Sequence, residues 1–350
     1  MKSICLMIVW FGKLPDYYYY WKRTALANKT IDFILLSDQV EDHKEGNITY
    51  IYSTLENEIQ RYRLALGNVC KFESPSKLCD FKPLFGYLYQ DLFTGYDFWG
   101  YCDIDLALGD LRKFISRKVL DNNERIYSLG HLNLYKNNEK MRMLFKESGS
   151  IYRLTDVLKD QRIYAFDEFL GMNLICQKND VFWYKKIDYC DCSGRSNKIE
   201  FINQINYKKQ LCYWEDGRAY VAGLSDSGQI INKEFSYIHW RKKLPALVDS
   251  QDSSLGFYIT PFGIFDKQTP GKPSLYEIEE YGKSYTESKL RDSRIQNIRL
   301  IHKIIEFVKL PYNQKRYRFK ELGYAVFGDN PPYSDYRSVV FPKPMVYYEE

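Results

Sequence analysis

Residues 96–106 read YDFWGYCDIDL, an apolar run that ends in two acidic residues spaced two positions apart. Such a run is typical of a buried β-strand, in which side chains at i and i+2 point to the same side. We therefore expect the strand to carry Asp103 and Asp105 together to its carboxyl end. Paired carboxylates favour a hard cation such as Mn²⁺ or Mg²⁺, which takes further oxygens, most often from a diphosphate. The alternative is a chance triplet on a solvated loop.

The first fifty residues alternate apolar strands with a helix. Runs of β-branched and apolar residues at 3–11, 31–37 and 48–52 predict strands, and residues 16–28 predict a helix. This order is typical of an α/β fold with a parallel sheet.

The loops that follow the first two predicted strands are candidate ligand contacts. They contain Phe11 and Gly12 in one case and Ser37 and Asp38 in the other. In open α/β sheets, ligands bind beyond the carboxyl ends of the strands. We therefore expect a nucleotide to lie on these four residues.

Composition excludes several classes of protein. The chain has 350 residues, 45% of them hydrophobic, which is enough for a sizeable core. Its net charge of +5 is too mild to indicate a nucleic-acid partner. Eight cysteines show no Cys-x-x-Cys pair, so we expect reduced thiols. Residues 1–10 are too short an apolar run for a signal peptide or membrane span, so we expect a cytoplasmic protein.

A set of motifs resembles a family of bacterial cytosolic glycosyltransferases with the GT-A fold, found among capsule and O-antigen genes. The motifs are FKPLFG at 81–86, YDFWG at 96–100, DID at 103–105, GDL at 109–111 and GH at 130–131. The resemblance implies a Rossmann-like fold that binds nucleotide-diphosphate sugars, with Asp103 and Asp105 as its metal motif. It also implies transfer of a hexose from a uridine diphosphate hexose, galactose by family habit, to a saccharide or lipid-linked saccharide.

The resemblance also suggests donor and acceptor contacts upstream and downstream of the metal motif. Asp80 and Lys82 are candidates for uracil, ribose or phosphate contacts, although an ordinary helix N-terminus explains them equally well. Gly130, His131 and Asn133 follow a predicted strand and could meet sugar hydroxyls of the acceptor. A partly buried structural histidine is the alternative.

Asp167 and Glu168 are the candidate catalytic carboxylates. Inverting GT-A enzymes place a base in this part of the chain, where it takes the proton of the acceptor hydroxyl. At a helix start the two side chains would point about 100° apart, so we expect one of them to reach the acceptor. Acidic residues are also favoured in any first helical turn, and a retaining enzyme would use this pair for acceptor binding only.

Residues 230–243 read as a strand-like run that ends in basic residues. In GT-A enzymes a late histidine often completes the metal shell, which suggests this role for His239. Arg241 and Lys243 would lie on the same side of the strand and neutralise the leaving diphosphate. The alternative is a solvated basic strand end.

We expect two parts of the chain, a GT-A domain at 1–245 and an extension at 246–350. Turn residues predict a loop-rich segment over 244–285. Residues 291–320 hold nine Lys or Arg against two acidic residues, with isoleucines at helical spacing. This basic amphipathic helix could lie on the inner face of the cell membrane, or dock on the main domain.

Two other classes of function remain open at this point. The same aromatic residues and carboxylates could form a metal-assisted lectin or a nucleotide-binding regulator without turnover. A nucleotidyltransferase also pairs carboxylates around metal ions, but it needs a Gly-rich phosphate loop, and residues 11–15 hold one glycine.

Overall fold

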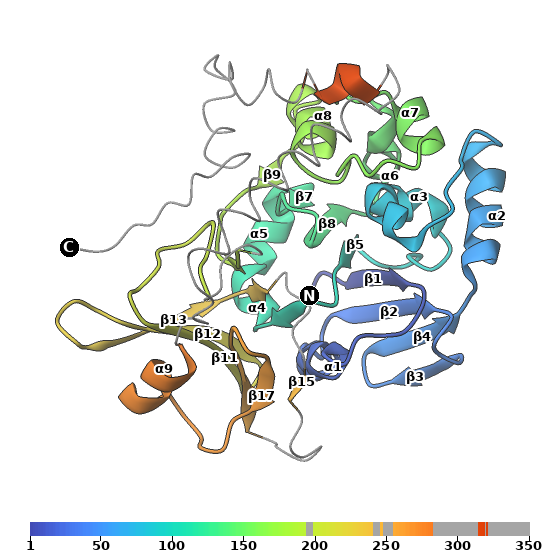
Figure 1. Ribbon diagram of the computed structural model, residues 1–350. Coiled ribbons are helices and arrows are strands. Elements are labelled where there is room, and N and C mark those ends of the chain that lie inside the picture. Colours follow the sequence, from blue (N-terminus) through green and yellow to red (C-terminus); the bar gives the residue numbers. More distant parts are fainter. Residues whose placement is uncertain (194–198, 241–245, 248–254, 283–313, 319, 321–350) are drawn as a thin grey trace.

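The computed structural model describes residues 1–193, 199–240, 246–247, 255–282, 314–318 and 320 (Figure 1). Within these residues the chain forms a mixed α/β fold around a large mixed sheet. This sheet has eight strands in the order β3-β4-β2-β1-β5-β8-β7-β9. They are β1 (Ile4–Trp10), β2 (Asp32–Ser37), β3 (His43–Glu45), β4 (Ile48–Tyr52), β5 (Phe98–Cys102), β7 (Arg125–Ile126), β8 (Leu132–Lys136) and β9 (Trp183–Tyr184).

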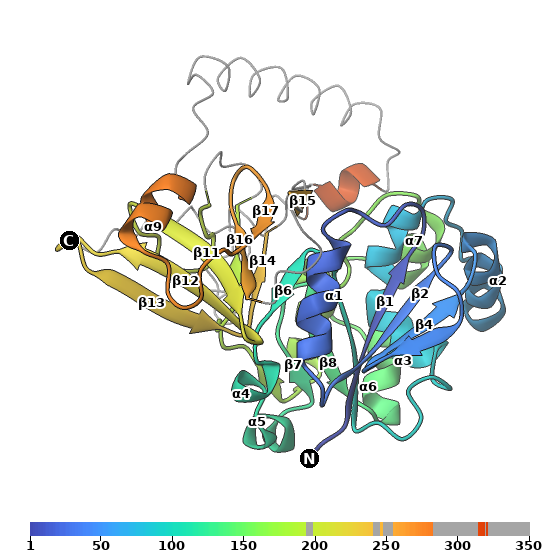
Figure 2. The ribbon, with the colours of Figure 1, turned by 90° about the horizontal axis from the view of Figure 1, so that it is seen from below.

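The strands and the helix predicted from the first fifty residues are confirmed. β1 pairs in parallel with β2 and β5, and β2 pairs in parallel with β4. Side chains alternate along β1, so Leu6 joins an apolar cluster with helix α1 (Tyr18–Ala27) and Met7 joins another with helix α2 (Leu55–Leu66). The two helices therefore cover opposite faces of the sheet (Figure 2).

The chain leaves the large sheet just after β5. Asp103 and Asp105 lie in the short segment between β5 and the next strand, and β6 (Leu106–Leu108) then enters a second sheet in the order β10-β14-β6. Its other strands are β10 (Cys190–Asp191) and β14 (Tyr237–His239). Both aspartates thus lie together beyond the carboxyl end of β5, as expected, but neither belongs to the strand, which ends at Cys102 where the chain turns toward its new partners.

Among the described residues, a third sheet has six strands in the order β13-β12-β11-β16-β17-β15. They are β11 (Gln210–Glu215), β12 (Arg218–Leu224), β13 (Ile230–Phe235), β15 (Ala246–Leu247), β16 (Gly256–Ile259) and β17 (Ile264–Asp266), with helix α9 (Leu275–Tyr281) packed beside them. Within the described residues of the segment predicted to be loop-rich, 246–247 and 255–282, three short strands and one helix alternate with loops. The boundary expected at 245 separates β11–β13 from β15–β17, which belong to the same sheet. The run from 230 to 239 is also two strands in different sheets, separated at Ser236.

The two larger sheets contact each other through α1. Arg23 Nη1 lies 2.9 Å from Asp266 Oδ1 of β17, and the Tyr20 and Phe257 ring centroids are 4.7 Å apart. Further helices are short: α3 (Phe85–Leu88), α4 (Leu111–Phe114), α5 (Arg117–Asn122), α6 (Glu139–Met143), α7 (Leu154–Lys159) and α8 (Leu174–Lys178), with 3₁₀ helices at Pro75–Leu84 and Leu144–Lys146 and a kinked π-helical turn at Phe169–Asn173.

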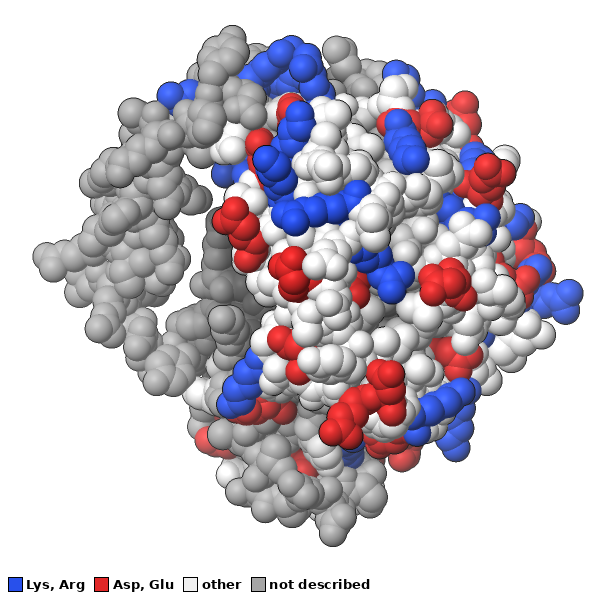
Figure 3. Space-filling model, turned by 90° about the vertical axis from the view of Figure 1, so that its right-hand side faces the viewer, with Lys and Arg blue, Asp and Glu red and all other residues white. Residues whose placement is uncertain are grey.

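Most of the predicted basic helix lies outside the described residues, as do Arg241 and Lys243. The described turn at 314–318 packs on the main body, where the backbone N–H of Arg153 donates to the Tyr317 hydroxyl at 3.1 Å. Among the described helices, none combines the length and apolar character that a membrane span needs. The face that includes α2 carries basic and acidic side chains interspersed with one another (Figure 3).

Candidate functional site

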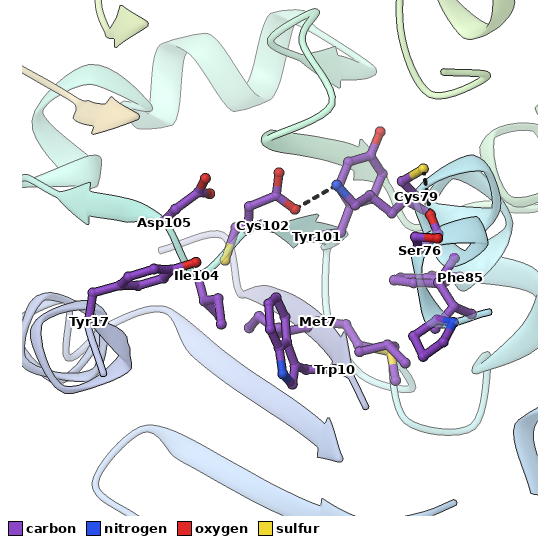
Figure 4. A pocket seen from close by; sticks show the side chains of 16 residues that line it. Met7, Trp10, Tyr17, Ser76, Cys79, Phe85, Tyr101, Cys102, Ile104 and Asp105 are labelled. Atoms are coloured by element: carbon purple, nitrogen blue, oxygen red, sulfur yellow. Dashed lines mark hydrogen bonds and ion pairs between the residues drawn. The ribbon is translucent and has the colours of Figure 1, made fainter. Parts of the chain in front are cut away.

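A cavity of about 390 Å³ opens beyond the carboxyl ends of β1 and β5 (Figure 4). Predicted site residues Lys82, Asp103 and Asp105 line it, together with Trp10 and Tyr17, which the sequence did not single out. The remaining lining residues are Met7, Ile8, Val9, Pro75, Ser76, Leu78, Cys79, Phe85, Tyr101, Cys102 and Ile104. The cavity therefore lies where an α/β sheet places its ligands, with two carboxylates and one ammonium on an otherwise mostly apolar wall.

Asp103, Asp105 and His239 form one cluster beside this cavity. Their candidate ligand atoms all lie within 4.8 Å of one another, and His239 Nε2 is 3.3 Å from Asp105 Oδ2. Strand pairing produces this proximity, because His239 on β14 lies opposite Leu106 at the start of β6. The backbone N–H of Trp240 also donates to the carbonyl of Asp105 at 3.2 Å. The structure thus brings together the three residues predicted to hold a metal.

The charges of this cluster are strongly interdependent. Burial acts to raise the pKa of Asp105, but His239 and Lys82 together outweigh it and lower that pKa below its ordinary value. Burial raises the pKa of Asp103, although Lys82 opposes the shift. His239 would have a lowered pKa from burial alone, but Asp105 and Asp191 raise it to about 10. A metal ion at this position would therefore compete with the His239 proton and release it on binding.

The donor set fits a divalent cation. Two carboxylates and one imidazole from Asp103, Asp105 and His239 surround a point that borders the cavity, so further positions remain open for ligand oxygens. Imidazole is a better ligand for transition metals than for Mg²⁺, which favours Mn²⁺ of the two predicted ions. A second candidate group, His131, Asp191 and His239, shares the same imidazole and is wholly buried.

Lys82 connects the metal cluster to the second acidic pair. Its ammonium lies 2.6 Å from Asp103 Oδ1 and 3.8 Å from Asp167 Oδ2, and it donates to the carbonyl of Gly130 at 3.0 Å. Burial acts to lower the pKa of Lys82, but Asp103 and Asp167 outweigh it and raise that pKa above its usual range. Lys82 is therefore a fixed positive charge at the wall of the cavity.

Asp167 and Glu168 both face Gly130. The Gly130 N–H donates to Glu168 Oε1 at 3.1 Å, and a Cβ on Gly130 would lie 2.2 Å from Asp167 Oδ2 and 3.0 Å from Glu168 Oε1. The pair precedes the π-helical turn, so the expected 100° separation on a helix is wrong. Burial raises the pKa of Asp167 well above its ordinary value, against the effect of Lys82. Carboxyl groups that act in general acid–base catalysis often have a pKa shifted in this direction.

Asp80 does not line the cavity. Its carboxylate accepts from the backbone N–H groups of Tyr164 and Phe166 at 3.0 Å and lies 2.8 Å from Lys77 Nζ. These partners use the oxygens that a nucleotide contact would need, and Asp80 has no exposed surface. The structure therefore contradicts the predicted donor contact and shows Asp80 bracing the segment that leads into Asp167.

His131 directly precedes β8 and Asn133 lies within it, and their side chains are buried, at 2% and 0% exposed. Asn133 Oδ1 accepts from the Arg125 guanidinium at 3.0 Å, and the His131 ring centroid lies 4.3 Å from that of His239. This placement contradicts their predicted role in acceptor binding, because β8 is an interior strand of the sheet and both side chains are covered. Gly130, the third member of that predicted group, provides space for the acidic pair.

The loops after β1 and β2 contact each other. The Gly12 N–H donates to Asp38 Oδ1 at 2.9 Å, and Gly12 has the positive φ of +85° that favours glycine. Phe11 and Ser37 are buried and do not line the cavity. Trp10 does, and its indole N–H donates to the Gly12 carbonyl at 3.1 Å. The four predicted loop residues therefore lie at adjacent strand ends, but none of them lines the cavity, whose wall at this point is formed by Trp10.

Comparison with known proteins gives a family but no assigned activity. No curated protein matches this chain in sequence. A similar solved structure is "Crystal structure of the glycosyltransferase GlyE in Streptococcus pneumoniae TIGR4", at 12% identity and a TM-score of 0.29, covering 53% of this chain and 45% of that chain. The family model described as "Family of unknown function (DUF6625)" matches residues 6–268, about three quarters of the chain. The protein therefore belongs to the DUF6625 family.

Proposed function

We propose that this protein is a metal-dependent glycosyltransferase that moves a hexose from a nucleotide-diphosphate sugar to a saccharide acceptor. One observation carries the proposal: Asp103, Asp105 and His239 converge at the edge of a cavity that lies beyond the ends of parallel strands. A nucleotide in this cavity would bring its diphosphate to the two carboxylates. The donor we expect first is uridine diphosphate galactose, and the acceptor belongs to capsule or O-antigen synthesis, free or lipid-linked.

Donor binding would divide between the cavity wall and the metal cluster. The faces of Trp10 and Tyr17 offer apolar surface for the nucleoside, and Lys82 adds a positive charge near the diphosphate. Asp103, Asp105 and His239 would hold Mn²⁺, which when bound neutralises charge that develops on the leaving nucleotide diphosphate. Lys82 would assist by the same electrostatic effect, because it stays protonated beside Asp103.

Acceptor activation would belong to Asp167 and Glu168. Glu168 is the more exposed of the two, whereas the Asp167 side chain is 5% exposed. If the reaction inverts configuration, one of these carboxylates takes the proton of the acceptor hydroxyl as the sugar transfers. If the reaction retains configuration, the pair holds the acceptor hydroxyl by hydrogen bonds.

Hydrolysis of the donor in the absence of acceptor tests the proposal. The full chain is incubated with uridine diphosphate galactose, uridine diphosphate glucose, uridine diphosphate N-acetylglucosamine and guanosine diphosphate mannose, each with Mn²⁺ or with a chelator. We expect slow release of nucleoside diphosphate from one of them that requires Mn²⁺. Binding of a donor without release would instead identify a binding module. Release of pyrophosphate from a nucleoside triphosphate and a sugar phosphate would identify a nucleotidyltransferase.

A further inference from the structure

His239 lies between two carboxylates on opposite sides of its ring. On the cavity side its Nε2 is 3.3 Å from Asp105 Oδ2, and on the buried side its Nδ1 is 2.9 Å from Asp191 Oδ1. The second contact follows from the sheet, since β10 and β14 pair in parallel with Asp191 opposite His239. A buried carboxylate is thus aligned with the nitrogen that faces away from the cavity.

Asp191 is too deeply buried to contact a substrate. It has no exposed surface, and its backbone N–H donates to Asn203 Oδ1 at 2.9 Å, which fixes its place on β10. Across the same cluster, Asp191 Oδ2 lies 4.0 Å from His131 Nε2, and the His131 ring packs at 34° to the His239 ring. The ring of His239 is therefore held from behind by one hydrogen bond and one aromatic contact.

We propose that Asp191 is the positioning residue of the metal cluster, fixing the tautomer and orientation of His239. A carboxylate accepts the Nδ1–H, so Nε2 faces Asp105 and the cavity and offers its lone pair to a metal once its own proton has left. This inference rests on the proposed metal role of Asp103, Asp105 and His239. The inference also assigns a role to His131, because the His131 ring limits the rotation of the His239 ring.

The alternative reading of the same residues is a second ion between His131, Asp191 and His239. The geometry favours the hydrogen bond, because 2.9 Å is the ordinary length of an N–H···O bond. The three side chains are 2%, 0% and 9% exposed, so this group lacks the open face of the cluster at the cavity. A metal there would give a second equivalent in the titration described next.

The affinity for Mn²⁺ tests the inference without any measurement of turnover. Free Mn²⁺ is titrated by electron paramagnetic resonance against the full chain and three variants, Asp191→Ala, Asp191→Asn and Asp188→Asn. Asp191→Ala should bind Mn²⁺ about 10- to 100-fold more weakly, the usual effect of losing such a partner. Asp191→Asn keeps a carbonyl that can accept the Nδ1–H, so it should recover part of the loss.

Asp188→Asn is the matched control. Asp188 is also a buried carboxylate of this segment, but it accepts from the Tyr127 hydroxyl at 2.7 Å and does not contact His239. The Asp188→Asn variant should unfold at a lower temperature than the wild type and keep wild-type affinity for Mn²⁺. Equal weakening by Asp188→Asn and Asp191→Asn would show a merely structural effect and overturn the inference.

The remaining outcomes separate the inference from the proposed function. In one outcome, the wild type binds one Mn²⁺, Asp105→Asn does not bind it, and Asp191→Ala binds it with full affinity. This outcome would refute the positioning role of Asp191 alone. Wild-type protein that binds no Mn²⁺ would refute the proposed metal site, and with it both proposals. Two equivalents in the wild type, falling to one in Asp191→Ala, would replace positioning by a second metal site.

Discussion

Two pairs of carboxylates meet at Lys82, and their surroundings differ. Asp103 and Asp105 follow β5 and line the cavity, with side chains 33% and 24% exposed. Asp167 and Glu168 precede the π-helical turn and lie against Gly130, where the Asp167 side chain is 5% exposed. The Lys82 ammonium lies 2.6 Å from Asp103 Oδ1 of the first pair and 3.8 Å from Asp167 Oδ2 of the second. The carboxylates of the first pair are thus accessible from the cavity, whereas the Asp167 carboxylate of the second pair is covered.

The difference teaches how one fold assigns separate chemistry to similar groups. His239 and Lys82 together lower the pKa of Asp105 below its ordinary value despite burial, which suits a group that stays charged and holds a cation. Burial raises the pKa of Asp167, which suits a group that exchanges a proton. Burial also raises the pKa of Asp103, so the contrast holds between Asp105 and Asp167. Divergent pKa values in neighbouring carboxyls are the usual sign of divided roles.

The largest expected effect separates the first pair from the second. Asp105→Asn should abolish Mn²⁺ binding and reduce donor hydrolysis to the rate seen with a chelator, because it removes a charged ligand. Asp97→Asn is the control, since Asp97 lies just before the other end of β5 and accepts from the Ser3 N–H at 2.8 Å. Near wild-type hydrolysis with Mn²⁺ in Asp105→Asn would rule out the metal cluster.

The second prediction concerns proton transfer by the covered pair. In an inverting enzyme, Asp167→Asn or Glu168→Gln should slow sugar transfer by about 10²- to 10⁴-fold, the usual value of general base help. Mn²⁺ affinity should stay near that of the wild type, because neither residue belongs to the metal cluster. The measurement is transfer rate beside Mn²⁺ titration, with the anomer of the product determined by NMR. Full rates in both variants with an inverted product would move the base elsewhere.

Much of the fold follows from local pattern. The alternation of apolar runs and a helix predicts β1, β2, β4 and α1, because a buried parallel strand needs a continuous apolar run whatever its neighbours. The separation of residues 230–239 into two strands cannot be predicted from the local sequence pattern. Both halves carry strand-like residues, and the choice of sheet depends on the pairing of Tyr237 with Leu108, far away in the chain.

The residues of the candidate site that could be predicted are likewise those with a local signal in the sequence. Asp103, Asp105 and His239 were predicted because an acidic pair after an apolar run and a late histidine are visible in the sequence. Asp191 was missed because it lies between two buried cysteines, and its only signal is a partner 48 positions away. His131 and Asn133 were assigned to the acceptor because sequence does not reveal which strand end is covered.

The third prediction tests the link between the pairs. Lys82→Met leaves Asp103 and Asp167 without their shared cation and should lower the free energy of unfolding by about 3 kcal/mol. Mn²⁺ should restore part of this loss, since it supplies positive charge beside Asp103. Urea unfolding with Mn²⁺ or chelator measures both. Lys77→Met, which breaks the 2.8 Å contact with Asp80, should destabilise equally in both conditions. If Mn²⁺ does not change the stability lost in Lys82→Met, Lys82 does not interact with the metal cluster.

The smallest expected effect concerns the glycine that makes room for the second pair. Gly130 does not have a positive φ, so alanine there is not strained by the backbone itself. Its Cβ would instead meet Asp167 Oδ2 at 2.2 Å and Cγ at 2.9 Å. Overpacking of this kind costs about 1 to 3 kcal/mol, so Gly130→Ala should lower unfolding free energy by that amount while Mn²⁺ affinity changes little.

The clash predicts a specific coupling between Gly130 and Asp167. In Gly130→Ala/Asp167→Ala the new methyl group occupies space that the carboxylate has left, so the double variant should be more stable than the sum of the single changes implies. Chemical unfolding of the wild type and the three variants measures this coupling directly. Simple additivity would mean that Asp167 does not lie against Gly130, and the contrast between an accessible and a covered carboxylate pair would then fail at its second member.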